Sequence, residues 1–194
     1  ARALLSQNHG PLSEHTSKAL LRCYGLPAMR EFLATTEQQA VVHARTIGGP
    51  VALKVQSPDL LHKTEAGALR LNVVGDDEVL RDYKDVVAAS RACRSDARIE
   101  GVLVQEMTID AHEMLIGISH EPSLGPIVTF GLGGIHVEVL NDVAIRLPPF
   151  DQHVALDGLN GLRSAAILKG VRGRPASDIN ALVDALVRVS WLAV

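Results

Sequence analysis

One apolar, strand-forming segment of this chain carries a lysine in its middle. Residues 51–56 read Val-Ala-Leu-Lys-Val-Gln, so Lys54 is surrounded by residues typical of a buried strand. A lysine is costly to bury unless its ammonium group has an anionic partner, and a phosphate suits that compact charge. The segment therefore predicts a strand whose lysine contacts a phosphate. The polar loop that follows contains residues that can close over the same phosphate, namely His62, Lys63, Thr64 and Gly67.

Composition limits the class of protein to which such a site can belong. The chain has 194 residues, of which 47% are hydrophobic and 21% charged, as in one globular domain or two associated subdomains. A net charge of −3 with dispersed basic residues argues against a nucleic-acid partner. Cys23 and Cys93 lack metal-ligand spacing, which argues against a zinc site or a disulfide framework. No apolar run approaches the ~20 residues that span a bilayer, so we expect a cytoplasmic protein without a membrane partner.

Helix and strand patterns alternate along the chain. Capping residues and helical spacing predict helices at residues 13–24, 36–47, 76–93 and 177–192, and a further helix that begins at Asp151. Apolar and β-branched runs predict strands at residues 30–34, 51–56, 69–74, 101–105, 113–119, 126–130 and 143–147. We expect the turn at 120–125 to join its two flanking strands as an antiparallel pair, which the glycines from Gly131 end. The pattern indicates an α/β protein.

Six short motifs, in this order, resemble the ATP-grasp domain of NDP-forming acyl-CoA synthetases. The motifs are Tyr24–Pro27, Pro50–Lys54, Ser57–Asp59 with His62 and Lys63, Gly101–Met107, Glu113–Gly117, and Phe130–Gly134 with Val137–Leu140. The chain is similar to the β subunit of ADP-forming acetyl-CoA synthetase and more distantly to that of succinyl-CoA synthetase. The resemblance implies an α/β (α+β) ATP-grasp fold of two subdomains with mixed or antiparallel sheets and flanking helices. The expected subdomains are 17–103 and 104–194, with 1–16 as an N-terminal extension or linker.

The same resemblance implies an acid–thiol ligase. Enzymes of this family convert a carboxylic acid, CoA and ATP into acyl-CoA, ADP and phosphate, and pass a phosphoryl group through a histidine on a CoA-binding domain. The implied cofactors are ATP or ADP and Mg²⁺, with CoA bound mainly by that partner domain or subunit. We also expect a small carboxylic acid substrate, whose identity this chain does not reveal, and an oligomer.

The resemblance assigns nucleotide contacts to several residues. Lys54 matches the lysine that touches the phosphates. Gln105, Glu106 and Met107 match the hinge between the subdomains, where backbone groups read the adenine edge. Glu113 matches an acidic residue that faces the nucleotide, although a solvated charge at a strand end explains it equally well.

The resemblance also assigns residues to phosphoryl transfer and to the metal. Imidazole is a nucleophile near neutral pH, so His62, with Lys63 beside it, is a candidate phosphoryl relay; a solvated surface histidine is the alternative. Backbone N–H groups at the glycine run can approach phosphate oxygens. The glycines concerned are Gly131, Gly133 and Gly134. Glu138 and Asp142 are candidate magnesium ligands, although neighbouring carboxylates on a turn are usually solvated.

One family motif does not occur in this sequence. The family continues into Glu-x-Asp-x-Asn-Pro-Leu, whose asparagine, with a later aspartate, holds the magnesium, whereas this chain stops at Val194. We therefore expect a C-terminally truncated domain whose main metal ligands lie beyond residue 194, and which is inactive alone.

Two other functions remain open on the sequence. A protein lysine acetyltransferase can carry a synthetase-like regulatory module that binds nucleotide or acyl-CoA weakly. Alternatively, the chain is a nucleotide-binding interaction domain whose last helix, with Trp191, packs on a partner.

Overall fold

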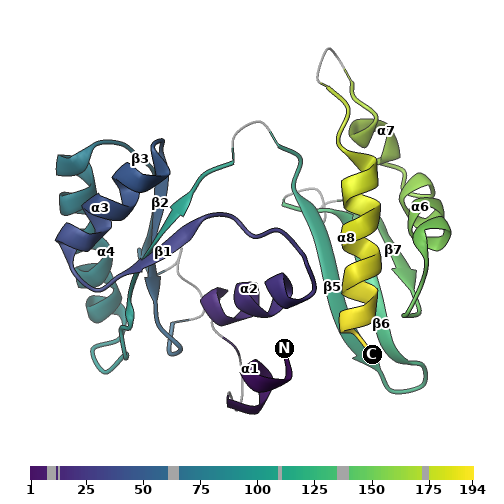
Figure 1. Ribbon diagram of the computed structural model, residues 1–194, viewed down its shortest axis with the longest axis horizontal. Coiled ribbons are helices and arrows are strands. Elements are labelled where there is room, and N and C mark those ends of the chain that lie inside the picture. The colour runs from purple at the N-terminus through teal and green to yellow at the C-terminus, as the bar shows by residue number, and fades with distance from the viewer. Residues whose placement is uncertain (8–11, 13, 61–65, 109–110, 135–139, 172–174) are drawn as a thin grey trace. The chain divides into compact units, whose positions relative to one another are not determined.

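The computed structural model contains two compact units, each built on its own antiparallel sheet (Figure 1). Unit 1 comprises residues 1–23 and 27–109, and unit 2 comprises residues 24–26 and 110–194. The structure describes residues 1–7, 12, 14–60, 66–108, 111–134, 140–171 and 175–194. Within these ranges, no helix is long and apolar enough to cross a membrane.

Unit 1 has a four-stranded antiparallel sheet in the order β1-β4-β2-β3. Its strands are β1 (Glu31–Ala34), β2 (Val51–Gln56), β3 (Leu69–Val73) and β4 (Gly101–Glu106). Its helices are α1 (Arg2–Gln7), α2 (Glu14–Cys23), α3 (Glu37–Ile47) and α4 (Asp76–Cys93). The two central strands, β2 and β4, are buried along almost their whole length, which explains their continuous apolar sequence.

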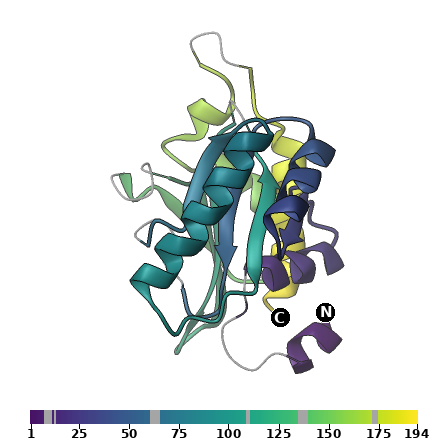
Figure 2. The same cartoon turned by 90° about the vertical axis from the view of Figure 1, so that its left-hand side faces the viewer.

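The two faces of this sheet carry different side chains. Leu53 and Val55 of β2 pack with Val102 and Val104 of β4 in a hydrophobic core that includes residues of α3 and α4. Figure 2 shows these two helices lying across that face. Because successive side chains of a strand point to opposite faces, the intervening residues of β2 and β4, among them Lys54, point away from this core.

Unit 2 has a three-stranded antiparallel sheet in the order β5-β6-β7. Its elements are β5 (Met114–Glu121), β6 (Gly125–Leu132), β7 (Val143–Arg146), α6 (Gln152–Asn160), α7 (Ala165–Leu168) and α8 (Ile179–Leu192). Phe130 of β6 is fully buried, and its ring centroid lies 6.3 Å from that of Phe150. Leu168 of α7 and Leu186 of α8 are also fully buried. Aromatic and aliphatic side chains therefore form the core of unit 2.

Two predicted helix caps are confirmed. The Thr36 hydroxyl accepts a hydrogen bond from the Gln39 N–H at 3.2 Å at the start of α3. The Asp151 carboxylate accepts one from the Val154 N–H at 3.0 Å at the start of α6. The predicted cap Ser13 lies outside the described residues. The last helix is capped by Asp178, whose carboxylate accepts a hydrogen bond from the Ala181 N–H at 2.9 Å.

The structure corrects several predicted boundaries. Residues 1–16, for which we expected an N-terminal extension or linker, contain α1 and the start of α2. The predicted division after residue 103 lies inside β4, which continues to Glu106 because Glu106 pairs with Val51. The units divide after residue 109 instead. The hairpin of unit 2 is tighter than predicted, with Glu121 opposite Gly125.

One strand is longer than the sequence patterns indicated, and one short helix is additional. Gly131 lies within β6 and does not end it, because it pairs with Leu115 on one side and Val143 on the other. The short helix α7 was not predicted, since four residues are too few to show helical spacing. Cys23 and Cys93 are both free and exposed.

Candidate functional site

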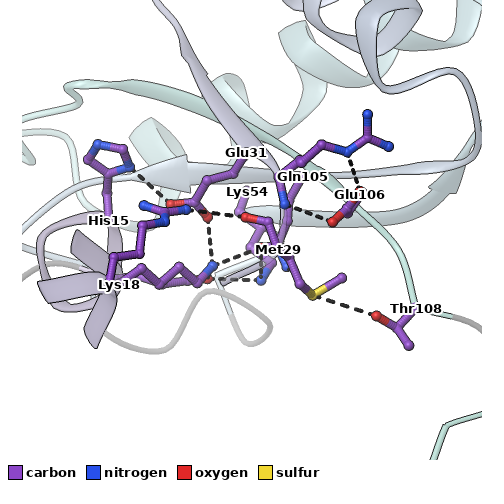
Figure 3. Close-up of polar contacts among 11 residues, drawn as sticks. His15, Lys18, Met29, Glu31, Lys54, Gln105, Glu106 and Thr108 are labelled. Atoms are coloured by element: carbon purple, nitrogen blue, oxygen red, sulfur yellow. Dashed lines mark hydrogen bonds and ion pairs between the residues drawn. The ribbon is translucent and has the colours of Figure 1, made fainter. Parts of the chain in front are cut away.

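A group of charged and polar side chains lies on the face of the unit 1 sheet that points away from α3 and α4. Figure 3 shows polar contacts within this group. Three of its members come from the sheet and three from α2. We call it the lysine cluster, and it consists of Glu14, His15, Lys18, Glu31, Lys54 and Gln105. The cluster brings together two of the predicted site residues, Lys54 and Gln105.

Lys54 has its anionic partner within the chain. Its Nζ donates to Glu14 Oε1 at 3.0 Å and to Gln105 Oε1 at 2.9 Å. The Lys54 side chain is 21% exposed, so its ammonium group is only partly accessible to water. The expected partner of Lys54 is thus present as a carboxylate, which shows that this position accepts an anionic oxygen.

Lys18 is the most connected residue of the cluster. Its Nζ donates to Glu14 Oε1 at 2.7 Å, to Glu31 Oε2 at 2.6 Å and to Gln105 Oε1 at 3.1 Å. The Glu31 side chain is fully buried, and its other oxygen lies 3.0 Å from His15 Nδ1. Burial lowers the pKa of Lys18, but the hydrogen bonds and negative charges of Glu14 and Glu31 outweigh it, so the pKa is raised.

Glu106, a predicted nucleotide contact, is engaged with Arg30. Its carboxylate accepts from the Arg30 N–H at 2.8 Å and from Arg30 Nε at 2.6 Å, and its own N–H donates to the Arg30 carbonyl at 3.0 Å. The backbone and side-chain hydrogen bonds from Arg30 lower the pKa of Glu106. Met107, the next predicted contact, accepts a hydrogen bond from the Asn72 N–H at its sulfur, at 3.1 Å. Both side chains therefore have partners within unit 1.

In unit 2, Glu113 and the glycine run lie together at the start of β5. The Gly133 N–H donates to the Glu113 carbonyl at 2.8 Å. A Cβ on Gly134 would contact the Glu113 carboxylate, and Gly134 has a φ of +58° that favours glycine. A Cβ on Gly131 would instead strike the Asp142 carbonyl. Sheet packing therefore explains Gly131, the Gly133 N–H is already bonded, and Gly134 beside Glu113 is the better candidate for binding.

Asp142, a predicted magnesium ligand, holds backbone of its own unit. One carboxylate oxygen accepts from the Arg163 N–H at 3.0 Å and the other from the Ser164 N–H at 2.7 Å. As a metal ligand Asp142 stays a prediction. Glu138, the other predicted ligand, lies outside the described residues, as do His62 and Lys63. In the described part of the chain, no three His, Cys, Asp or Glu side chains are grouped closely enough to hold a metal.

Sequence reasoning missed four of the six residues of the lysine cluster. Glu14, His15, Lys18 and Glu31 were not predicted, although Glu14 and Lys18 have the i, i+4 spacing of a helical ion pair. Glu31 lies at the start of a strand, where charged residues are common because strand ends are often exposed, so the sequence did not single it out. Its burial depends on α2 lying against the sheet.

Comparison with known proteins identifies the family. The sequence pattern of the ATP-grasp domain matches residues 3–194. The chain is 38% identical over 189 residues to the β subunit of acetate–CoA ligase [ADP-forming] II of Pyrococcus furiosus, covering 97% of this chain and 80% of that subunit. Longer relatives match at similar identity, and this chain spans about a quarter of their length.

Solved structures support the same relationship. Dinucleotide-forming acetyl-coenzyme A synthetase 1 of Ca. Korarchaeum cryptofilum, in complex with coenzyme A, Ca-AMPCP and HgCl⁺, superposes with a TM-score of 0.90 at 36% identity. The match covers 94% of this chain and 80% of that one. A second structure of that enzyme, with coenzyme A and Mg-AMPPCP, has its phosphohistidine segment pointing towards the nucleotide binding site. It superposes with a TM-score of 0.82 at 31% identity, over 99% of this chain and 82% of that one.

Proposed function

The chain belongs to the ATP-grasp family, and on that premise we propose that it is the nucleotide-binding module of an ADP-forming acyl-CoA ligase. In the complete protein this module takes part in the conversion of a carboxylic acid, CoA and ATP into acyl-CoA, ADP and phosphate. The close relatives named for acetate favour a small acid as the substrate.

The observation that carries this proposal is the environment of Lys54. Lys54 belongs to the lysine cluster, its side chain is about four-fifths buried, and its ammonium group binds a carboxylate oxygen of Glu14. A phosphate oxygen is an acceptor of the same kind with more negative charge, so a nucleotide phosphate fits this position chemically. Glu113 and Gly134 in unit 2 are a second, separate set of candidate nucleotide contacts.

Phosphoryl transfer needs little covalent chemistry from the protein. The reacting groups must be positioned, and the charge on the phosphate oxygens must be neutralised. Lys54 supplies positive charge, and the hydrogen bond from Lys54 to Gln105 ties that charge to a central strand. His62 remains our candidate for passing the phosphoryl group onward.

The described residues provide no ready-made magnesium site. Both oxygens of Asp142 already accept backbone hydrogen bonds, and no group of three potential ligands is present among the described residues. We expect Mg²⁺ to arrive with the nucleotide. One relative was solved in complex with Mg-AMPPCP. The partner proposed for this module is a CoA-binding, phosphohistidine-bearing domain or subunit, in a cytoplasmic and oligomeric enzyme.

The Lys54→Met variant tests the proposal. Methionine keeps the length of the side chain but removes the charge, and a charged hydrogen bond contributes about 1.5–3 kcal/mol, so the Kd for Mg-ADP should rise roughly ten- to hundred-fold. The measurements are calorimetric titration of Mg-ADP into the natural-length protein and, separately, ADP formation from Mg-ATP in the presence of acetate and CoA.

The matched control is Lys84→Met. Lys84 of α4 is 65% exposed and pairs with Glu37 of α3 at 3.1 Å, so its loss should leave the Kd unchanged. Equal affinity of the Lys54→Met variant and the wild type would remove Lys54 from nucleotide binding. Binding without any acyl-CoA formation by the natural-length protein would instead favour the regulatory module of a lysine acetyltransferase.

A further inference from the structure

The two lysines of the lysine cluster share the same two oxygen atoms. Glu14 Oε1 accepts from Lys18 at 2.7 Å and from Lys54 at 3.0 Å. Gln105 Oε1 accepts from Lys18 at 3.1 Å and from Lys54 at 2.9 Å. Two ammonium groups that share both acceptors are close neighbours, although one comes from a helix and the other from a central strand. Two neighbouring ammonium groups repel each other, and an anion that lies between them offsets this repulsion.

The anion that bridges them belongs to a partly exposed side chain. Glu14 is the first residue of α2, and its side chain is 27% exposed. By contrast, Glu31, which also binds Lys18, is fully buried and is held by His15 as well. Glu14 is therefore the carboxylate of the cluster that can turn towards water, whereas Glu31 stays in place as a partner of Lys18.

We propose that Lys18 is a second phosphate ligand of the nucleotide site, and that Glu14 holds the position of a phosphate oxygen until a nucleotide displaces it. The inference rests on the proposed function, because it takes Lys54 as a phosphate contact. A phosphate oxygen that replaces Glu14 Oε1 between the two lysines is within hydrogen-bond distance of both ammonium groups.

Charge balance explains why Glu14 must leave. With both lysines protonated and both glutamates ionised, these four side chains carry no net charge. A phosphate that entered beside Glu14 would meet a like charge in a poorly hydrated place, whereas a phosphate that replaces Glu14 meets two cations. Glu14 therefore competes with the nucleotide, and Lys18 changes its partner from Glu14 to the phosphate while it keeps Glu31.

Four variants of the natural-length protein test this by calorimetric titration of Mg-ADP, with Lys84→Gln as the surface control. Lys18→Gln should raise the Kd at least about ten-fold, the loss of one charged hydrogen bond, and Lys18→Arg should restore most of the affinity. Glu14→Gln should lower the Kd by about three-fold or more, because a neutral amide competes less well for two ammonium groups.

The fourth variant separates binding from folding. Lys18→Gln alone leaves the buried Glu31 without its lysine, which can weaken the fold, so the double variant Lys18→Gln/Glu31→Gln removes both charges together. If Lys18 binds phosphate, the double variant binds Mg-ADP as weakly as Lys18→Gln. Recovery of wild-type affinity in the double variant would show that Lys18 acts only through Glu31, and would overturn the inference.

The remaining outcomes distinguish this inference from the proposed function. If Lys54→Met loses Mg-ADP binding while Lys18→Gln and the double variant stay within two-fold of wild type, Lys18 is not a ligand and the proposed function stands. If Glu14→Gln binds Mg-ADP more weakly than wild type, Glu14 positions Lys54 and does not compete with phosphate. That result would overturn the claim that the nucleotide displaces Glu14. If the wild-type protein binds no Mg-ADP, both proposals fail.

Discussion

Replacing Asp142 by asparagine should destabilise unit 2. Asp142 is 9% exposed, and each of its carboxylate oxygens accepts one backbone N–H, from Arg163 or from Ser164, just before α7. Asparagine has the same shape but only one acceptor oxygen, so one N–H would face an NH₂ group and lose its bond. The bond that remains becomes neutral, which lowers its contribution by about 1 kcal/mol, and a buried N–H without a partner costs about 1–3 kcal/mol, so the free energy of unfolding should fall by about 2–4 kcal/mol.

The pH dependence follows from the same contacts. Hydrogen bonds from Ser164 and Arg163 hold the pKa of Asp142 below its usual range. Because this pKa is lower in the folded protein, the stabilisation is fully present above the pKa of the unfolded chain, about 3.9, and is lost as the pH falls through the folded value. The stability difference between wild type and Asp142→Asn should therefore be constant near neutral pH and shrink below about pH 4.

The assay is urea unfolding followed by the fluorescence of Trp191. It is the only tryptophan of the chain and lies in α8, so it reports on unit 2. Asp157→Asn is the matched control, because Asp157 is 71% exposed and its ion pair with Arg146 at 3.0 Å should contribute less than about 1 kcal/mol. An unchanged urea midpoint for Asp142→Asn, together with lost Mg²⁺-dependent ADP binding, would refute the reasoning and make Asp142 a metal ligand.

Two further substitutions test the packing of unit 2 and the side chain of Glu106. Gly158→Ala should destabilise unit 2 by about 1–3 kcal/mol despite the higher helix propensity of alanine, because the new Cβ would lie 2.5 Å from Phe130 Cζ; a higher urea midpoint would contradict this. Glu106→Gln should change the Kd for Mg-ADP by no more than about three-fold, because the partly exposed Glu106 carboxylate binds Arg30 within unit 1. A larger loss in the calorimetric titration would mean that this side chain contacts the nucleotide.

Much of the local structure could be predicted because its causes lie within a few residues. The Thr36 and Asp151 caps act three residues along the chain, and both are confirmed. The alternation of residues 51–56 places Lys54 on the face opposite Leu53 and Val55, as the pleat of a strand requires. Boundaries were less predictable: the end of β4 is set by pairing of Glu106 with Val51, which is remote in sequence.

The candidate site was only partly predictable for the same reason. Family motifs pointed to Lys54 and Gln105, which the structure brings within 2.9 Å of each other. No motif pointed to Lys18 or Glu31, because their burial depends on the docking of α2 against the sheet. Asp142 was interpreted from its neighbours in the sequence, whereas its hydrogen-bond partners lie about twenty residues later.

The sequence by itself determined the family, the order of helices and strands, and the presence of a lysine inside an apolar strand. These properties depend on residue type and on short-range spacing, which a single chain displays directly. Only the tertiary structure decided which anion Lys54 binds, that Lys18 stands beside it, and that Glu106 and Asp142 hold backbone groups. The partners of a charged side chain are chosen by packing between distant segments, since burial makes an unpaired charge too costly and the nearest available partner is fixed by the fold.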